Sequence, residues 1–310
     1  MKKKISIAIP CFNEEPNIKT TYDRIKSVIQ KFKQHNFEFI IVDNGSTDKT
    51  KEVVKKIVKK DKRVKGIFLS RNFGPEASAT ACYTYATGDV IIAIAADLQD
   101  PPELIPKFIQ KWEQGNDIVF GIYTKTEDPL FITWIRKAFY IIFKSISNID
   151  VPVNATGFGL VSRKATDAFL SLPEKFRFSR GLLSWVGFKR DYIYYEKNRR
   201  EKGKSSYSFF DYVKHAERGI FGFSYLILDL MIYGGFILVL FSFLFIIGYF
   251  YTVVVVGNPI KASIPTLLVI VFFGGVQLLA ISIIGKYIQV IVEETKGRPV
   301  YIVDETANIK

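Results

Sequence analysis

The chain between residues 90 and 103 reads VIIAIAADLQDPPE, and it contains both a strand and the point where that strand stops. The apolar residues 90–96 have the composition of a buried strand. Two carboxylates, an amide and two prolines follow at once. Because proline fixes φ and is favoured in the first turn of a helix, the strand ends here and its polar residues stay at its carboxyl end.

Apolar runs of the same kind recur along the first 120 residues and alternate with helical patterns. The other runs of strand type cover residues 5–10, 37–43, 64–70 and 117–122. Between them, apolar residues recur at the helical spacing of three and four, first at Ile18, Tyr22, Ile25, Ile29 and Phe32 and then at Val53, Val54, Ile57 and Val58. This alternation predicts βαβ units and an α/β domain with a mostly parallel, Rossmann-like sheet.

Polar and turn-forming residues follow four of the predicted strands. These stretches read PCFNEE (10–15), VDNGSTD (42–48), SRNFG (70–74) and DLQDPPE (97–103). Since parallel sheets bind ligands beyond the carboxyl ends of their strands, we expect all four to line one crevice. Neither a dinucleotide-binding Gly-x-Gly-x-x-Gly nor a full Gly-x-x-x-x-Gly-Lys-Ser/Thr phosphate loop is present, which argues against those two kinds of site.

Asp97 and Gln99 stand two residues apart on the segment that leaves the sheet, so both can offer an oxygen to one hard cation. Mg²⁺ or Mn²⁺ typically takes one or two carboxylates and completes its shell with substrate phosphate and water. Such an ion could hold a nucleoside diphosphate and stabilise it as a leaving group. The alternative is an ordinary turn, in which Asp100 caps the next helix and Asp97 is only solvated.

The ends of the first two strands offer groups that suit a nucleoside. The Asp43 carboxylate could accept a hydrogen bond from a base N–H, and Pro10 with Phe12 could form an apolar ledge for the base. Asn13 or Glu14 could then contact the ribose. A structural role at a strand end or helix start is equally compatible with each of these residues.

The C-terminal third has the composition of a membrane anchor. Residues 230–260 and 262–285 carry no charge, and Lys261 alone separates them. Since a spanning helix needs about 20 apolar residues, two transmembrane helices are predicted, at about 226–256 and 263–289. Lys and Arg flank the pair on its outer sides, which places the N-terminal domain and both termini in the cytosol. A buried helix pair of a soluble protein is the alternative.

The charge balance of the 310-residue chain agrees with an anionic partner. Its formal net charge is +13. Phosphorylated ligands or anionic lipid headgroups would suit this charge. A nucleic-acid partner is not expected, because the basic residues flank the membrane spans instead of forming a groove interleaved with aromatic residues.

The ordered set of strand-end motifs resembles family 2 glycosyltransferases with the GT-A fold. The later stretches RGLLSWVGF (180–188), RREKGKSSYS (199–208) and EETKGRPVYIV (293–303), with the two predicted spans, are similar to the polyisoprenyl-phosphate glycosyltransferases. This group includes dolichol-phosphate mannose synthase and the bactoprenol glucosyltransferases. The resemblance covers nearly the whole chain.

The resemblance implies roles for particular residues. Asp97 and Gln99 would hold Mg²⁺ or Mn²⁺ on the donor diphosphate. Apart from the resemblance, Asn154 is a further candidate catalytic residue, which could bond a sugar hydroxyl. The nucleotide-sugar pocket would be lined by Pro10, Phe12, Asn13, Glu14, Asp43 and Asp97. The lipid phosphate would be held by cationic residues near the membrane, namely Arg136, Lys137, Arg200, Lys202 and Lys204. General attraction to anionic headgroups is an alternative role for each of these cations.

The sequence departs from the family pattern at two places. Ala95 stands where relatives often have the first acid of Asp-x-Asp. In the segment 151–160, Asn154 and Gly157 stand where many relatives have two aspartates, and Gly159 replaces an arginine. A hydroxyl acceptor would suffer from the loss of a general base. A phosphate monoester, whose second pKa is about 6, is already a nucleophile at neutral pH.

The expected reaction is therefore transfer of a hexose from a nucleotide sugar, with UDP favoured by analogy, to undecaprenyl or dolichyl phosphate, with inversion. The expected architecture is a GT-A domain over 1–222 with interface helices at about 129–147 and 206–222, a two-helix membrane hairpin within 223–292, and a cytosolic tail over 293–310. The alternatives are transfer to a membrane glycan hydroxyl and a non-catalytic nucleotide-sugar-binding scaffold. The sequence leaves open whether the helices form a homo-oligomer.

Overall fold

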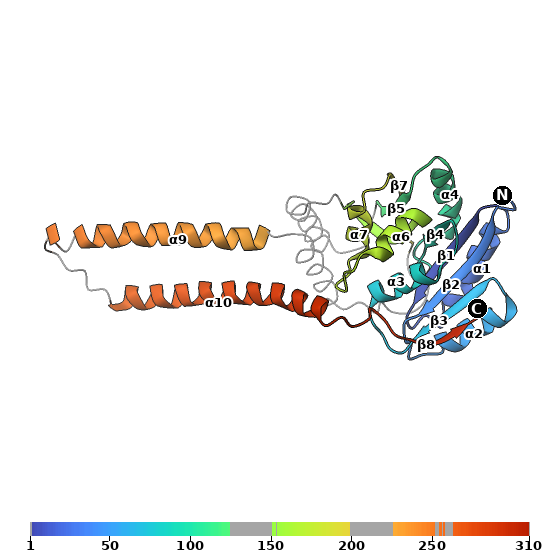
Figure 1. Ribbon diagram of the computed structural model, residues 1–310, viewed down its shortest axis with the longest axis horizontal. Coiled ribbons are helices and arrows are strands. Elements are labelled where there is room, and N and C mark those ends of the chain that lie inside the picture. The colour runs from blue at the N-terminus through green and yellow to red at the C-terminus, as the bar shows by residue number, and fades with distance from the viewer. Residues whose placement is uncertain are drawn as a thin grey trace.

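The computed structural model describes residues 2–124, 151–152, 154–198, 226–251, 254–255, 257 and 263–309. These residues form an α/β domain from which two long helices extend (Figure 1). The predicted interface helices at 129–147 and 206–222 lie outside the described residues.

The described strands form one eight-stranded sheet with the order β7-β5-β6-β4-β1-β2-β3-β8. They are β1 (Lys4–Cys11), β2 (Asn36–Asp43), β3 (Val64–Leu69), β4 (Val90–Ala93), β5 (Ile118–Tyr123), β6 (Ala155–Ser162), β7 (Arg190–Tyr195) and β8 (Val303–Ala307). The neighbours β4, β1, β2 and β3 are mutually parallel, while β6 and β8 run antiparallel to the strands beside them. The predicted α/β class and mostly parallel sheet are confirmed.

Helices cover both faces of the sheet. They are α1 (Ile18–Ile29), α2 (Thr50–Lys60), α3 (Pro75–Tyr85), the 3₁₀ turn η1 (Pro102–Leu104), α4 (Ile105–Glu113), α6 (Arg163–Ser171) and α7 (Ser179–Trp185). One buried core joins α1, α2 and α4 to the sheet, and a second joins α3, α6 and α7. Helix α1 ends at Ile29, before the predicted Phe32, and its other predicted apolar residues are buried.

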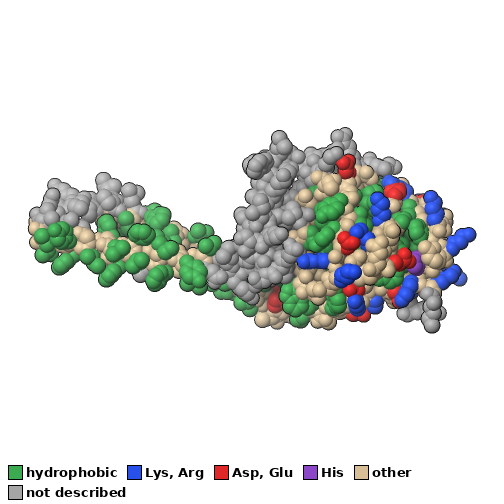
Figure 2. All heavy atoms as spheres, turned by 90° about the horizontal axis from the view of Figure 1, so that it is seen from above, with side chains coloured by type: hydrophobic (Ala, Val, Ile, Leu, Met, Phe, Trp, Pro, Cys, Tyr) green, Lys and Arg blue, Asp and Glu red, His purple; other side chains and the backbone are tan. Residues whose placement is uncertain are grey.

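The two long helices are α9 (Leu226–Tyr251) and α10 (Ser263–Thr295), which run beside each other away from the domain (Figure 1). On the face shown in Figure 2, hydrophobic side chains cover the described helices, and charged side chains appear on the domain. The segment Val269–Thr295 is long and apolar enough to cross a membrane, and none of it is buried within the protein. By length and composition, α10 is therefore a candidate membrane span.

The C-terminal residues return to the domain after α10. Strand β8 pairs antiparallel with β3, with Ala307 opposite Gly66. Asp304 pairs with Lys51 at 3.0 Å, and Glu305 pairs with Lys55 at 2.7 Å. The sequence did not predict this strand, because its half-exposed polar composition resembles a tail.

A buried carboxylate joins three strands at the opposite, amino-terminal edge of the sheet. Glu38 of β2 is 4% exposed and accepts hydrogen bonds from Ser6 Oγ at 2.6 Å and from the Thr87 N–H at 2.7 Å. Lys4 and Lys65 lie 2.8 and 3.1 Å from its Oε2. Burial opposes the charged form, but the bonds from these lysines and from the Ser6 and Thr87 donors lower the pKa of Glu38 to about 2.

We expect Glu38→Gln to lower the free energy of unfolding by roughly 1.5–3 kcal/mol at pH 7, the range for hydrogen bonds to a charged group. Because the folded-state pKa is depressed from 4.5 to about 2, this contribution is complete above about pH 5 and disappears as the pH falls toward 2. The unfolding midpoints of the detergent-solubilised parent and variant should therefore converge in acid. A gap between them that does not change with pH would contradict the assignment.

Candidate active site

The carboxyl ends of four parallel strands lie side by side at one edge of the sheet. Asp43 at the end of β2 is in register with Cys11 of β1 and with Phe68 of β3. Strand β4 pairs with the other side of β1. These ends face the side of the domain from which the helix pair extends (Figure 1). The loops 10–15, 42–48, 70–74 and 97–103 therefore follow neighbouring strands at one edge of the sheet, and we call these loops together the strand-end site.

The chain turns sharply at Leu98, between the two predicted metal ligands. Leu98 has φ +62°, in the left-handed region that is strained for a branched side chain, and it is 2% exposed. Packing of this side chain therefore holds the strained backbone in place. Asp97 and Gln99 are half-buried on either side, and Asp97 Oδ1 accepts the Gln99 N–H at 3.2 Å. The turn leaves both side chains partly open to solvent.

The next carboxylate, Asp100, points into the protein instead. It is 5% exposed, and its Oδ1 accepts the hydroxyl hydrogen of Tyr195, which also lies 3.0 Å from Thr156 Oγ1. Burial raises the pKa of Asp100 to about 6, although the Tyr195 hydrogen bond opposes the rise. Asp100 therefore does not cap the following turn; it ties the 97–103 loop to β7 and β6.

The first strand-end loop is held by its own polar residues. Asn13 has φ +55°; its Oδ1 accepts the Thr47 N–H at 2.8 Å, and its N–H donates to Ser46 Oγ at 2.9 Å. Glu14 is 7% exposed and accepts a hydrogen bond from Asn17 Nδ2 at 2.7 Å. In this structure Asn13 joins the first loop to the second, whereas the Glu14 side chain bonds Asn17 of its own segment.

The other residues predicted for the donor are placed at the mouth of the same site. Pro10 and Phe12 are half-buried, whereas Asp43 is 1% exposed and accepts hydrogen bonds from the Ser46 N–H and hydroxyl. Burial raises the pKa of Asp43, which the bonds from Ser46 oppose. The Asp43 carboxylate is thus enclosed by the turn that follows β2.

Asn44 joins the second loop to the third, and the sequence analysis did not select it. Its Nδ2 donates to Asn72 Oδ1 at 3.0 Å and to the Gly74 carbonyl at 3.1 Å, and its Oδ1 accepts the Phe73 N–H at 3.0 Å. The next residue, Gly45, has φ +68°, and a Cβ there would lie 2.3 Å from the carbonyl carbon of Arg71. The Asn-Gly pair was the available signal, because it is typical of a tight turn.

Residues that depart from the family pattern lie near the carboxyl end of β4. In the β4–β6 ladder Ala93 pairs with Gly159, and Ala95 follows β4 two residues later. Asn154 precedes β6 with φ +60° and is half-buried. Gly157 is exposed, and nothing lies within 4 Å of where its Cβ would be.

The predicted lipid-phosphate residues lie outside the described part of the chain: Arg136, Lys137, Arg200, Lys202 and Lys204. The described residue that precedes this basic stretch in the sequence is nevertheless bonded to the strand-end site. The Asn198 N–H donates to the Gln99 carbonyl at 2.9 Å. Asn198, the last described residue before the basic stretch, therefore lies beside the 97–103 loop.

Asp97 and Gln99 fit a divalent cation that also binds a diphosphate. Among the described residues, no group of three or more His, Cys, Asp and Glu side chains could hold a metal ion. One carboxylate and one amide oxygen, both partly open, are the donor set expected when substrate phosphate and water supply the remaining ligands.

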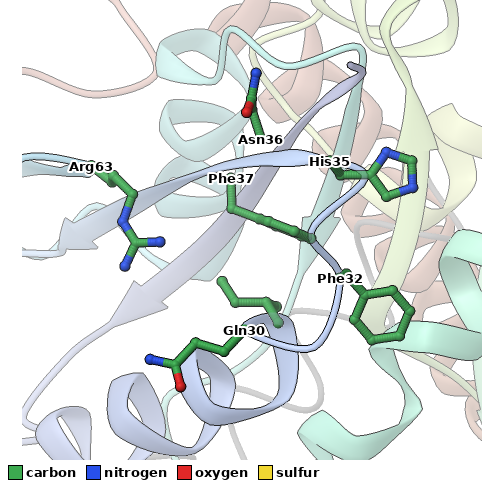
Figure 3. Close-up of a pocket in the computed structure, with 7 residues that line it drawn as sticks. Gln30, Phe32, His35, Asn36, Phe37 and Arg63 are labelled. Atoms are coloured by element: carbon green, nitrogen blue, oxygen red, sulfur yellow. The ribbon is translucent and has the colours of Figure 1, made fainter.

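A surface cavity of about 470 Å³ lies away from this site (Figure 3). Phe37, Asn36 and Arg63 line it, at the amino-terminal ends of β2 and β3. The Arg63 guanidinium bonds both oxygens of Asp61, at 3.0 and 2.7 Å. The cavity is thus at the sheet edge opposite to the strand-end site.

The sheet and its polar strand ends define a GT-A transferase fold, and comparisons with known proteins agree. The model of the family described as Glycosyl transferase family 2 matches residues 6–170. The uncharacterized glycosyltransferase YkcC of Bacillus subtilis (strain 168) is 37% identical over 306 residues, covering 98% of this chain and 94% of that protein. The bactoprenol glucosyl transferase of Shigella phage SfX is 34% identical over 301 residues, covering 97% and 98%.

A solved structure gives the same fold. Glucosyl-3-phosphoglycerate synthase from Mycobacterium tuberculosis, in complex with Mn²⁺, UDP-glucose and phosphoglyceric acid, has a TM-score of 0.50 at 18% identity, covering 71% of this chain and 78% of that one. The chain belongs to glycosyl transferase family 2. It is accordingly an enzyme, a glycosyltransferase.

We expect Gly45→Ala to lower the free energy of unfolding by roughly 2–4 kcal/mol, because it adds a backbone clash with Arg71 to the strain of a positive φ. Gly115→Ala is the matched control, since Gly115 has φ +86° with nothing within 4 Å of its Cβ position. Gly115→Ala should lower the free energy of unfolding only by the strain of its positive φ, about 1–2 kcal/mol. Thermal unfolding of both variants in detergent measures the difference, and equal losses would disprove the close packing of the loops.

Proposed function

We propose that this enzyme transfers a hexose from a nucleotide sugar, a UDP-linked donor, to a polyprenyl phosphate at the cytosolic membrane face. The observation that carries the proposal is the attachment of a long, exposed apolar helix, α10, to a family 2 glycosyltransferase domain. An acceptor that is dissolved in the bilayer requires such an anchor. Similarity to a bactoprenol glucosyl transferase over nearly the full length supports the same class of acceptor.

In this proposal the strand-end site holds the donor. Asp43 accepts a hydrogen bond from the base, Pro10 and Phe12 support its plane, and Asn13 and Glu14 fix the loop on which they lie. Asp97 and Gln99 would hold Mg²⁺ or Mn²⁺ beside the donor diphosphate, and such an ion would supply charge neutralisation for the departing nucleoside diphosphate. The solved synthase that binds Mn²⁺ with UDP-glucose has the same fold, which is consistent with this arrangement.

The acceptor side suits a phosphate better than a hydroxyl. Residues 151–160 contain no Asp or Glu, so this segment supplies no carboxylate base. A phosphate monoester is mostly dianionic at neutral pH and attacks without losing a proton. The enzyme must then position the two substrates and offset their mutual repulsion. Asn154 bonds a sugar hydroxyl, and in-line attack on an α-linked donor gives a β-linked product.

The membrane arrangement completes the proposal. Helices α9 and α10 form a two-helix hairpin, within 223–292, that makes the protein multi-pass with both termini in the cytosol. The interface helices at 129–147 and 206–222 lie on the bilayer surface, where Arg136, Lys137, Arg200, Lys202 and Lys204 hold the lipid phosphate. The catalytic domain then comprises residues 1–222 together with β8, which residues 293–310 contribute to its sheet on the cytosolic side.

We expect Asp97→Asn to reduce transfer to undecaprenyl phosphate on the order of 10²-fold or more, since the anionic metal ligand is lost. A chelator should abolish transfer by the parent enzyme, and added Mg²⁺ or Mn²⁺ should restore it. Asp167→Asn, an exposed aspartate on α6, is the control and should retain full activity. The assay follows radiolabel from a panel of nucleotide sugars into the organic phase. Full activity of Asp97→Asn would refute its role, and nucleotide-sugar binding without transfer would favour the scaffold alternative.

Gly157→Asp separates the two kinds of acceptor, because the open space at Gly157 accepts the new side chain. With a phosphate acceptor, the added carboxylate should lower transfer roughly five-fold, the effect of about 1 kcal/mol of charge repulsion. With a glycan hydroxyl acceptor, the new base should raise transfer. The measurement compares polyprenyl phosphate with a soluble oligosaccharide, and a rise on the oligosaccharide alone would replace the lipid-phosphate proposal.

A further inference from the structure

The last turn of α10 lies beyond its apolar part. The uncharged stretch of the helix ends at Gly285, and Glu294 follows nine residues later. At 1.5 Å per residue this places Glu294 about 13 Å further along the helix axis. Of the four residues 292–295, Glu294 alone is partly buried, and its neighbour Glu293 is exposed.

The carboxylate of Glu294 bonds backbone groups of the domain. Both of its carboxylate oxygens lie 2.9 Å from the backbone N of Lys175, and Oε1 also accepts the Phe176 N–H at 2.7 Å. Hydrogen bonds from backbone N–H groups to a carboxylate are charge-assisted and stronger than neutral ones. The end of α10 is thus joined to the loop between α6 and α7.

That loop is held to the domain by Arg177. Arg177 is 5% exposed; its Nε donates to the Glu174 carbonyl at 2.9 Å, and its Nη2 donates to the Leu172 carbonyl at 2.6 Å. The guanidinium also lies 4.9 Å from the ring centre of Phe169 in the core. We call residues 174–180 the brace.

The far end of the brace contacts two parts of the active site. The Ser179 N–H donates to Glu76 Oε2 at 2.9 Å, in the first turn of α3, directly after the 70–74 loop. Arg180 Nη1 donates to the Ala155 carbonyl at 2.7 Å, beside Asn154. Short bonded contacts therefore lead from the end of α10 to Glu76, directly after the 70–74 loop, and to Ala155, beside Asn154.

We propose that Glu294 is a positioning residue, which fixes the strand-end site relative to the membrane helix so that the donor meets a lipid phosphate at the bilayer surface. This inference rests on the proposed function, because it assumes that the acceptor is held by the membrane. Small errors in placement are costly, since a displacement of about 1 Å can reduce a rate 10²-fold. Loss of the Glu294 bonds lets the domain tilt without unfolding it.

The test compares Glu294→Gln with Glu293→Gln, which removes the same charge from the same helical turn. In the structure Glu293 bonds Gln289 Nε2 of its own helix, at 3.4 Å. Each variant is assayed with undecaprenyl phosphate in phospholipid vesicles and with a short-chain polyprenyl phosphate in detergent, which needs no fixed orientation. We expect Glu294→Gln to be about tenfold slower in vesicles and within about twofold of the parent in detergent. Glu293→Gln should match the parent in both.

Two results would overturn the proposal. Parent-like activity of Glu294→Gln in vesicles would show that the contact does not position the site. An equal loss with both acceptors would show a general effect on the fold or on the chemistry.

A distance measurement tests the same contact without any activity. Cysteines replace the exposed Lys107 of α4 and Ile288 of α10 and carry spin labels, while the natural Cys11 and Cys82 are buried. In vesicles the distance distribution should be narrow in the parent and in Glu293→Gln, and broad in Glu294→Gln. A narrow distribution in Glu294→Gln would refute the inference. If the parent transfers sugar to neither acceptor, the proposed function fails, and these distances still decide whether Glu294 fixes the domain.

Discussion

Parallel pairing of β4, β1, β2 and β3 is the constraint on which the active site depends. It brings four loops to one edge of the sheet. The backbone N–H and C=O groups of these loops have no neighbouring strand to bond, so they need other hydrogen-bond partners. The loops provide these partners for one another: Asn13 bonds residues after β2, and Asn44 bonds the loop after β3. The result is a polar surface whose loops hydrogen bonds already hold in place without a substrate.

Backbone strain concentrates at the same edge. In the described part of the chain four residues other than glycine have positive φ, and three of them, Asn13, Leu98 and Asn154, lie at or beside the strand-end site. A strained backbone persists only where the surrounding packing holds it in place, and such residues are common at functional sites. Leu98 is the clearest case, because its buried side chain keeps the residues on either side turned outward.

Most of the fold could be predicted from the sequence, since apolar runs and helical spacing depend on local pattern. The strands from β1 to β5 and the meeting of their polar ends follow from that pattern and from the rules for parallel sheets. What could not be predicted depends on contacts between distant residues. Tyr195 bonds Asp100 across 95 positions, and Lys51 bonds Asp304 across 253, with no local signal at either end. The sequence also did not predict that Asn13 bonds Thr47 or that Glu14 bonds Asn17, because the same residue types suit a ligand contact.

After the two long helices, the chain returns to the domain and pairs with β3. Because β8 belongs to the same sheet as β7, the two long helices are an insertion within one domain and not an appendage at its end. During synthesis the edge of β3 therefore stays uncovered until both helices have left the ribosome. An open edge is a template for unwanted pairing, so the order of synthesis exposes this sheet to aggregation until β8 has been made. Folding of the domain can be completed only after both long helices have been synthesised.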